Sequence, residues 1–215
     1  MPEPMTGDRS QPSALSFVYD RANLLTLAGL VCGILAISFS ARGAYTAAST
    51  ALLWALFCDW FDGPLARRIP DRTDHDRAFG AQLDSLADMV SSGVAPAMFL
   101  ICVGNFEPWF FPGAIMLVVA GAMRLAHFNV FGHDDQGAYR GLPIDTNIIV
   151  VTALFPFREL LGHITFSWVL YAAIVTLAIL KVAPFRMPKL VGVWYRVVAA
   201  YVVAMTFLNF IWLTR

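Results

Sequence analysis

The chain has 215 residues, of which 58% are hydrophobic and only 14% are charged. This composition excludes an ordinary water-soluble globular domain, because too few polar side chains are available to cover its surface, and it predicts a lipid bilayer as the surroundings. Fifteen basic residues balance fifteen acidic ones, so the net charge does not indicate nucleic-acid binding, and we expect no nucleic-acid partner.

Residues 1–20 are expected to form a disordered cytosolic leader, because the chain begins with a polar, proline-rich stretch. This stretch lacks the basic segment and apolar core of a cleaved signal peptide. Residues 21–215 are then expected to form a single membrane domain. Each of the three cysteines lies in an apolar run, which predicts small buried side chains rather than metal ligands.

Seven stretches approach the roughly 20 apolar residues that a transmembrane helix needs. They are residues 23–41, 44–62, 81–103, 109–131, 142–157, 165–183 and 193–213. The fifth of these stretches indicates a span least strongly. The sequence therefore predicts an all-α, polytopic transmembrane bundle with about seven spans and short polar loops between them.

The basic residues are distributed unevenly between the two ends of these spans. Eleven of the fifteen Lys and Arg residues lie on one side, three lie on the other, and Arg124 lies within the fourth span. Short loops rich in Lys and Arg remain cytoplasmic. We therefore expect a cytoplasmic N-terminus and a C-terminus on the opposite side.

Four aspartates interrupt the second and third spans near the expected cytoplasmic face. Asp59 and Asp62 are three residues apart, and Asp84 and Asp88 are four apart, so each pair lies on one helix face. Each acidic residue costs about 2.5–3.5 kcal/mol in the bilayer unless it is compensated. Two such faces packed together would form an all-oxygen cage, which suits Mg²⁺ or Mn²⁺ better than zinc.

Other unusual residues fall in the same layer. Small residues near the aspartates would let a phosphate or nucleotide approach the backbone, although ordinary close helix packing also uses them. Arg67 ends a span, where it either forks onto phosphate oxygens or anchors the topology. The complete set is Gly63, Ala66, Arg67 and Gly80 beside the aspartates, with Arg124, His127 and Asp145 on later spans.

Residues 59–67 (Asp-Trp-Phe-Asp-Gly-Pro-Leu-Ala-Arg) and 80–88 (Gly-Ala-Gln-Leu-Asp-Ser-Leu-Ala-Asp) resemble the signature of the CDP-alcohol phosphotransferase family. Within that family, residues 79–96, 124–129 and 141–144 look like the phosphatidylserine synthase branch. The resemblance implies an enzyme of phospholipid biosynthesis in which an alcohol attacks CDP-diacylglycerol and releases CMP. It favours L-serine as the alcohol.

The resemblance also implies a role for each matching residue. Asp59, Asp62, Asp84 and Asp88 would hold two Mg²⁺ or Mn²⁺ ions, and Asp88 would also act as the catalytic base. Gly63, Ala66, Arg67 and Gly80 would bind CDP, and Arg124, His127 and Asp145 would bind the acceptor or a phosphate. The family further implies a homodimer in a bacterial-type cell membrane, with the site facing the cytoplasm.

Three positions depart from the family pattern. Twelve residues separate Arg67 from Gly80, more than the family usually has, and the serine branch usually has arginine where His127 stands and proline where Asp145 stands. Choline, ethanolamine, glycerol or inositol therefore remain alternative acceptors. An ion-coupled transporter is a remote alternative, since the sequence shows no internal repeat.

Overall fold

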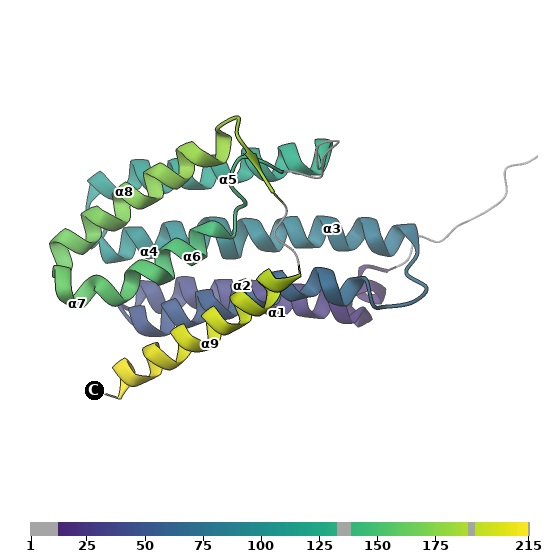
Figure 1. Cartoon of the computed structure of the whole chain (residues 1–215), viewed down its shortest axis with the longest axis horizontal. Helices are drawn as coiled ribbons and strands as arrows, with labels where there is room; N and C mark the ends of the chain where they lie inside the picture. The colour runs from purple at the N-terminus through teal and green to yellow at the C-terminus, as the bar shows by residue number, and fades with distance from the viewer. Residues whose placement is uncertain (1–12, 133–138, 189–191, 215) are drawn as a thin grey trace, which may run out of the picture.

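The computed structural model describes residues 13–132, 139–188 and 192–214, and these are almost entirely helical (Figure 1). The elements in chain order are η1 Ala14–Tyr19, α1 Arg21–Ala41, α2 Tyr45–Ala66, α3 Asp74–Asp88, η2 Met89–Val94, α4 Ala95–Val103, η3 Pro108–Phe110, α5 Phe111–Phe131, β1 Tyr139–Arg140, α6 Thr146–Leu154, η4 Phe155–Phe157, α7 Arg158–Leu161, α8 His163–Val182, β2 Arg186–Met187 and α9 Val193–Leu213. The strands β1 and β2 pair antiparallel, and η2 is a π-helix.

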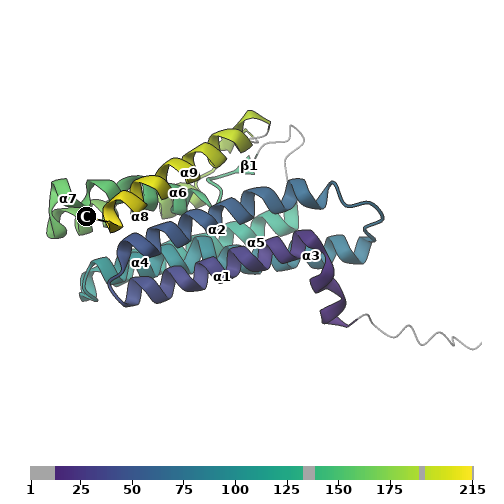
Figure 2. The same cartoon turned by 90° about the horizontal axis from the view of Figure 1, so that it is seen from below.

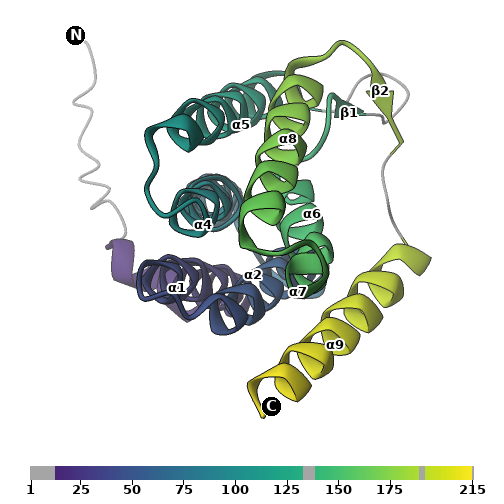
Figure 3. The ribbon, with the colours of Figure 1, turned by 90° about the vertical axis from the view of Figure 1, so that its left-hand side faces the viewer.

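The long helices lie side by side along one axis of the molecule, and α9 crosses the outside of the bundle at an angle (Figures 1 and 3). The helix α1 packs along α2, α5 packs along α8, and α9 packs on α2. At one end of the bundle α3 lies near η1 and the start of α1 (Figure 2).

Five helices in the described part of the chain are long and apolar enough to cross a membrane. They are α1, the continuous helix Asp74–Val103, the helix Pro108–Phe131, α8 and α9. Large apolar side chains such as Ile115, Val119 and Phe207 are exposed on their outer faces, where a bilayer would cover them. The protein is therefore an all-α polytopic integral membrane protein, which confirms the fold class predicted from composition and periodicity.

The second and fifth predicted spans are not among these five helices. The helix α2 has 22 residues, but it carries Asp59 and Asp62 within its apolar run. The fifth span, predicted from residue 142, instead begins with α6 at Thr146, and α6 has only nine residues before η4 and α7 continue it. The total of seven spans and the side of the N-terminus remain predictions.

Part of the predicted disordered leader is ordered. Residues 1–12 lie outside the described residues, but Ala14–Tyr19 forms the 3-10 helix η1. The ring of Phe17 stacks on Phe79 of α3 with 4.3 Å between centroids, and Asn23 Nδ2 donates to the Phe17 carbonyl at 2.9 Å. These contacts explain why the leader expected for residues 1–20 is partly structured.

The third long helix begins earlier than the predicted start at residue 81. Thr73 and Asp76 form a capping box, in which the Asp76 N–H donates to Thr73 Oγ1 at 3.1 Å and the Thr73 N–H donates to Asp76 Oδ2 at 2.9 Å. This reciprocal pair satisfies two free N–H groups and starts the helix at Asp74. Residues 74–80, which the sequence analysis left in the polar loop before residue 81, therefore belong to α3.

A π-helical turn follows Asp88 directly and fixes the direction of the helix that carries it. Pro96 has no backbone N–H, so the Ser92 carbonyl one turn earlier lacks its helical donor. Asn147 of α6 donates to that carbonyl at 2.7 Å. On the other side, Gly33 of α1 allows close contact, because a Cβ there would lie 2.7 Å from Ser91 Cα.

The hydrophobic core surrounds α4, away from Asp74 at the other end of the same long helix (Figure 1). Phe99 of α4 meets Phe155 edge to face with 5.9 Å between centroids, and both side chains are fully buried. Leu52 of α2 and Phe166 of α8 are buried around them. This core packs the helices together around α4. The acidic residues Asp84 and Asp88 lie outside it, in α3.

Candidate functional site

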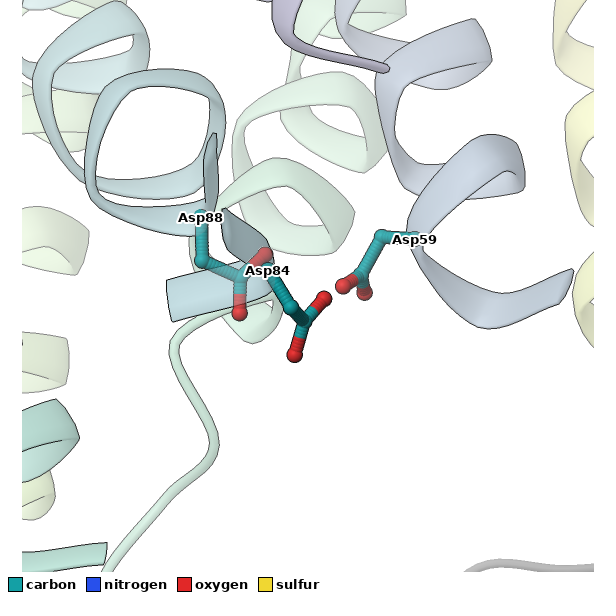
Figure 4. Close-up of side chains that lie close together, drawn as sticks. All are labelled: Asp59, Asp84 and Asp88. Carbon is teal, nitrogen blue, oxygen red and sulfur yellow. The ribbon is translucent and has the colours of Figure 1, made fainter. Parts of the chain in front are cut away.

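Three aspartate side chains from two helices converge on one point. Asp59 of α2 points toward Asp84 and Asp88 of α3 (Figure 4). One carboxylate oxygen from each residue lies within 4.8 Å of the other two. The spacing of four residues brings Asp84 and Asp88 onto the same face of α3, as the sequence predicts.

Asp62, the fourth predicted ligand, lies one turn further along α2 and is buried. The Thr26 hydroxyl of α1 donates to its Oδ2 at 2.6 Å. This short bond holds the Asp62 carboxylate toward α1. Asp59, Asp84 and Asp88 therefore form a cluster, and the carboxylate of Asp62 lies beside it. All four residues line the same cavity.

The donor set fits a hard divalent cation. Every contributing atom is a carboxylate oxygen, and oxygen ligands suit Mg²⁺ and Mn²⁺. Several carboxylates gathered at partly buried positions are costly without positive charge nearby. The cluster of Asp59, Asp84 and Asp88 could therefore hold a metal ion.

A cavity of about 350 Å³ opens over the aspartates. Its walls come from α2, α3, α5, α6 with the segment before it, β2 and α9, so residues distant in sequence share one space. It is lined by Asp59, Trp60, Asp62, Gly63, Pro64, Arg67, Asp84, Asp88, Arg124, Phe128, Pro143, Ile144, Asp145, Thr146, Ile149, Met187, Pro188 and Tyr195.

A second cavity, of about 260 Å³, adjoins the first and shares Asp62, Gly63, Arg67 and Asp84 with it. All four residues predicted from the sequence to bind CDP line this second cavity, namely Gly63, Ala66, Arg67 and Gly80. Its remaining walls are the start of α1, the loop before α3 and the first turns of α3. Asp62 and Asp84 thus lie where the two cavities meet, whereas Asp59 and Asp88 line the first cavity.

Arg124 and Asp145 bring opposite charges to the first cavity. The Arg124 side chain is buried and its guanidinium carbon lies 5.1 Å from the centre of the Phe128 ring. Asp145 precedes α6, and its Oδ2 accepts a hydrogen bond of 2.7 Å from Trp60 Nε1. Both residues were predicted from the sequence for an acceptor or phosphate.

His127, the third residue predicted for this role, is not brought to the cavity. It is exposed on α5, and its ring lies 4.7 Å from that of Phe131. Arg124 and Phe128, one helical turn apart, line the cavity instead. His127 and Phe128 are consecutive residues and therefore lie about 100° apart around the helix. The helix α5 turns Phe128 toward the cavity, so His127 projects away from it.

Lys181 supplies a buried cation, which the sequence analysis counted only among the eleven basic residues of the expected inner side. It is 2% exposed, and its Nζ donates to the Pro143 carbonyl and to Thr146 Oγ1, each at 3.2 Å. It also interacts electrostatically with Asp145. Lys181 therefore fixes the segment that leads Asp145 into the cavity.

Sequence reasoning missed other residues of the site for a common reason. Trp60 and Thr26 look like ordinary members of apolar spans, and their hydrogen bonds to Asp145 and Asp62 cross between helices. Tyr195 of α9, which accepts from Arg67 Nη2 at 3.2 Å, is distant in sequence.

Fold and site together define a membrane-embedded bundle in which acidic side chains and a buried arginine line adjoining cavities. The profile of the CDP-alcohol phosphatidyltransferase family matches residues 20–180. The chain belongs to this family, which confirms the resemblance found in residues 59–67 and 80–88.

Several curated proteins are similar to the chain. A CDP-diacylglycerol--serine O-phosphatidyltransferase of Helicobacter pylori (strain J99) is 32% identical over 132 residues, which cover 60% of this chain and 54% of that protein. A protein of the same name from Bacillus subtilis (strain 168) is 29% identical over 141 residues, covering 64% and 77%. A phosphatidylcholine synthase of Brucella melitensis biotype 1 is 30% identical over 178 residues, covering 80% and 59%. The chain spans about half the length of relatives such as the Helicobacter protein.

Proposed function

We propose that the protein transfers a phosphatidyl group from CDP-diacylglycerol to the hydroxyl of L-serine and releases CMP. The observation that carries this proposal is the convergence of Asp59, Asp84 and Asp88 on one point of the first cavity, which adjoins the second cavity at Asp84. Membership of the CDP-alcohol phosphatidyltransferase family supports the reaction type. The serine-specific names of several relatives support the acceptor.

Asp59, Asp62, Asp84 and Asp88 would hold Mg²⁺ or Mn²⁺ through carboxylate oxygens alone. The chemistry that these cations supply when bound is neutralisation of charge on the attacked phosphate and on the departing CMP. Thr26 keeps the Asp62 carboxylate in place through the bond of 2.6 Å. The protein thereby provides a preorganised anionic site for a cationic cofactor.

Asp88 would accept the proton of the attacking hydroxyl. The hydroxyl oxygen forms a bond to the phosphorus of the phosphatidyl group, and the bond from that phosphorus to the bridging oxygen of CMP breaks. CMP leaves with the electron pair, and the proton passes to the Asp88 carboxylate. The position of Asp88 supports this role, because the residue lines the cavity directly before the π-turn Met89–Val94.

The second cavity would receive the cytidine diphosphate. Gly63 and Ala66 leave room for the ligand beside the backbone of α2. Gly80 also lines this cavity, and the Arg72 guanidinium lies over it, since a Cβ there would be 2.8 Å from Arg72 Nη2. Arg67 lines both cavities and can present its planar guanidinium to phosphate oxygens. Its bond to Tyr195 holds it toward the site from α9.

The part of the first cavity lined by Arg124 and Asp145, here called the acceptor end, suits a zwitterion such as serine. Arg124 would bind the serine carboxylate, and Asp145 would bind the serine ammonium. Lys181 offsets the negative charge of Asp145 from the protein side, so that the pocket as a whole does not repel a carboxylate. His127 has no part in this arrangement because it lies outside the cavity lining.

Choline is the second candidate acceptor. Asp145 and the aromatic side chains of Trp60 and Tyr195, whose rings lie 5.8 Å apart, line the same cavity. Carboxylates and aromatic faces attract quaternary ammonium groups. The similarity to a phosphatidylcholine synthase over 80% of the chain also favours this alternative.

The test is CMP release by the purified protein with CDP-diacylglycerol, Mg²⁺ or Mn²⁺ and a panel of alcohols. The proposal predicts release with serine, and it predicts that Arg124→Met raises the KM for serine at least about tenfold. His127→Ala is the matched control on α5 and should leave that KM unchanged. Release with choline but not with serine would establish the second candidate, and no release with any alcohol would refute the reaction.

We also propose that the site faces the cytoplasm. The excess of basic residues on the expected inner side supports this orientation, as does the supply of CDP-diacylglycerol from nucleotide-dependent chemistry.

A further inference from the structure

A separate cavity of about 200 Å³, here called the far cavity, lies at the other end of the bundle. It is lined by Tyr45, Val103, Arg158, Glu159, Gly162 and His163. Its helix α7 lies at the end of the bundle opposite α3 (Figure 1). Tyr45 begins α2, and Asp59 lies fourteen residues further along the same helix, a distance of about 21 Å. The far cavity is therefore distinct from the two cavities at the aspartates.

Polar contacts hold the walls of the far cavity in place. The Tyr45 hydroxyl donates to the Cys102 carbonyl at 2.7 Å. The Ser167 hydroxyl lies 2.8 Å from the His163 carbonyl and 3.1 Å from the Val103 carbonyl, and both oxygens accept from it. These contacts tie the starts of α2 and α8 to the end of α4, so the shape of the cavity is set by the packing of three helices.

The far cavity contains a cation and a carboxylate side by side. Arg158 Nη2 donates to Glu159 Oε1 at 2.7 Å. The Arg158 guanidinium carbon also lies 5.1 Å from the centre of the Phe155 ring. A guanidinium has five N–H donors and a carboxylate has two oxygens, so this one hydrogen bond leaves donors on Arg158 and an oxygen on Glu159 that can meet a ligand. Opposite charges in one cavity suit a ligand that is itself a zwitterion.

The surroundings of the far cavity are apolar. Leu160 and Ile164, next to the cavity residues in sequence, are 82% and 76% exposed. The side chains of Trp109 and Trp168 are also exposed, and the ring of Trp168 lies 5.1 Å from that of Phe110 at the start of the α5 span. Tryptophans at the ends of spans are typical of the membrane–water interface. A ligand with a charged head and apolar chains therefore fits this position better than a free ion.

We propose that the far cavity binds the headgroup of a phospholipid that carries an amine, in the leaflet opposite the aspartate site. The phosphodiester oxygens accept from the Arg158 guanidinium, whose planar donors match phosphate. The ammonium group donates to the Glu159 carboxylate, and the acyl chains cover Leu160 and Ile164. Because none of these residues lines the aspartate cavities, this inference stands apart from the proposed function and does not depend on CMP release.

The test is thermal unfolding of the full-length protein in detergent with added phosphatidylethanolamine, phosphatidylglycerol, diacylglycerol or inorganic phosphate. Phosphatidylethanolamine is expected to raise the Tm of the wild-type protein by about 3 °C or more, and the other three additives are expected to raise it less. Arg158→Met should abolish this increase. Arg42→Met, at an exposed position at the same end of the bundle, is the matched control and should retain it.

The Tm increase caused by the lipid is compared within each variant, so that a loss of intrinsic stability does not count as a loss of binding. Glu159→Gln keeps Arg158 and its contact with Phe155, and it should make the increases from phosphatidylethanolamine and phosphatidylglycerol equal. An unchanged increase in Arg158→Met would overturn the inference, as would equal increases from these two lipids in the wild-type protein. An equal increase from inorganic phosphate would assign the cavity to a free anion and would also overturn it.

Discussion

Replacing Lys181 by methionine tests the buried charges beside the acceptor end. The substitution removes two hydrogen bonds of 3.2 Å, to the Pro143 carbonyl and Thr146 Oγ1, and leaves Arg124 as the remaining cation that acts on Asp145. Hydrogen bonds from a charged donor contribute about 1.5–3 kcal/mol each. We therefore expect Lys181→Met, which removes two of them, to lower the free energy of unfolding by about 3 kcal/mol or more.

The measurement is unfolding of the detergent-solubilised protein by a denaturing detergent or by heat. Thr176→Val, which replaces an exposed polar residue on the same helix, is the control and should change stability by less than about 0.5 kcal/mol. The double variant Lys181→Met/Asp145→Asn removes both charges, so its loss should be smaller than the sum of the single losses by about 1 kcal/mol or more. Strictly additive losses would refute the electrostatic coupling between Lys181 and Asp145.

Two further predictions concern catalysis and topology. Asp88→Asn should lower CMP release about a hundredfold or more with the fold retained, because an amide does not accept the proton. Ser85→Ala on the same helix is the control and should retain the wild-type rate. If Asp88→Asn keeps more than about a tenth of the wild-type rate, Asp88 is not the base. A cysteine in place of Asp74 should react with a membrane-impermeant reagent only in opened cells, whereas one in place of Phe106 should react in intact cells. The opposite labelling pattern would reverse the orientation.

The helical fold and the aspartate cluster were predictable because both depend on local spacing. Intervals of three and four residues bring carboxylates onto one helix face wherever a helix forms, and the apolar runs indicate the helices. The carboxylate oxygens of Asp59, Asp84 and Asp88 do lie within 4.8 Å of one another. Hydropathy likewise predicted the membrane class.

Features that depend on contacts between distant segments were not predictable. The burial of Lys181 depends on the carbonyl of Pro143, and the order of η1 depends on the Phe17–Phe79 stack. Closeness in sequence was also a poor guide, because His127 is three residues from Arg124 and still lies outside the cavity lining. A single sequence contains the residues for such contacts but no spacing rule that pairs them.

The central claim is that the aspartate cluster holds the divalent cation on which phosphatidyl transfer depends. Binding of Mn²⁺ to the full-length protein, followed by electron paramagnetic resonance, tests it most directly, with Asp74→Asn at the exposed start of α3 as the control. We expect saturable Mn²⁺ binding that Mg²⁺ displaces, that Asp74→Asn leaves unchanged, and that Asp84→Asn weakens at least about tenfold together with CMP release. Equal Mn²⁺ affinity in Asp84→Asn and the wild-type protein would contradict the account.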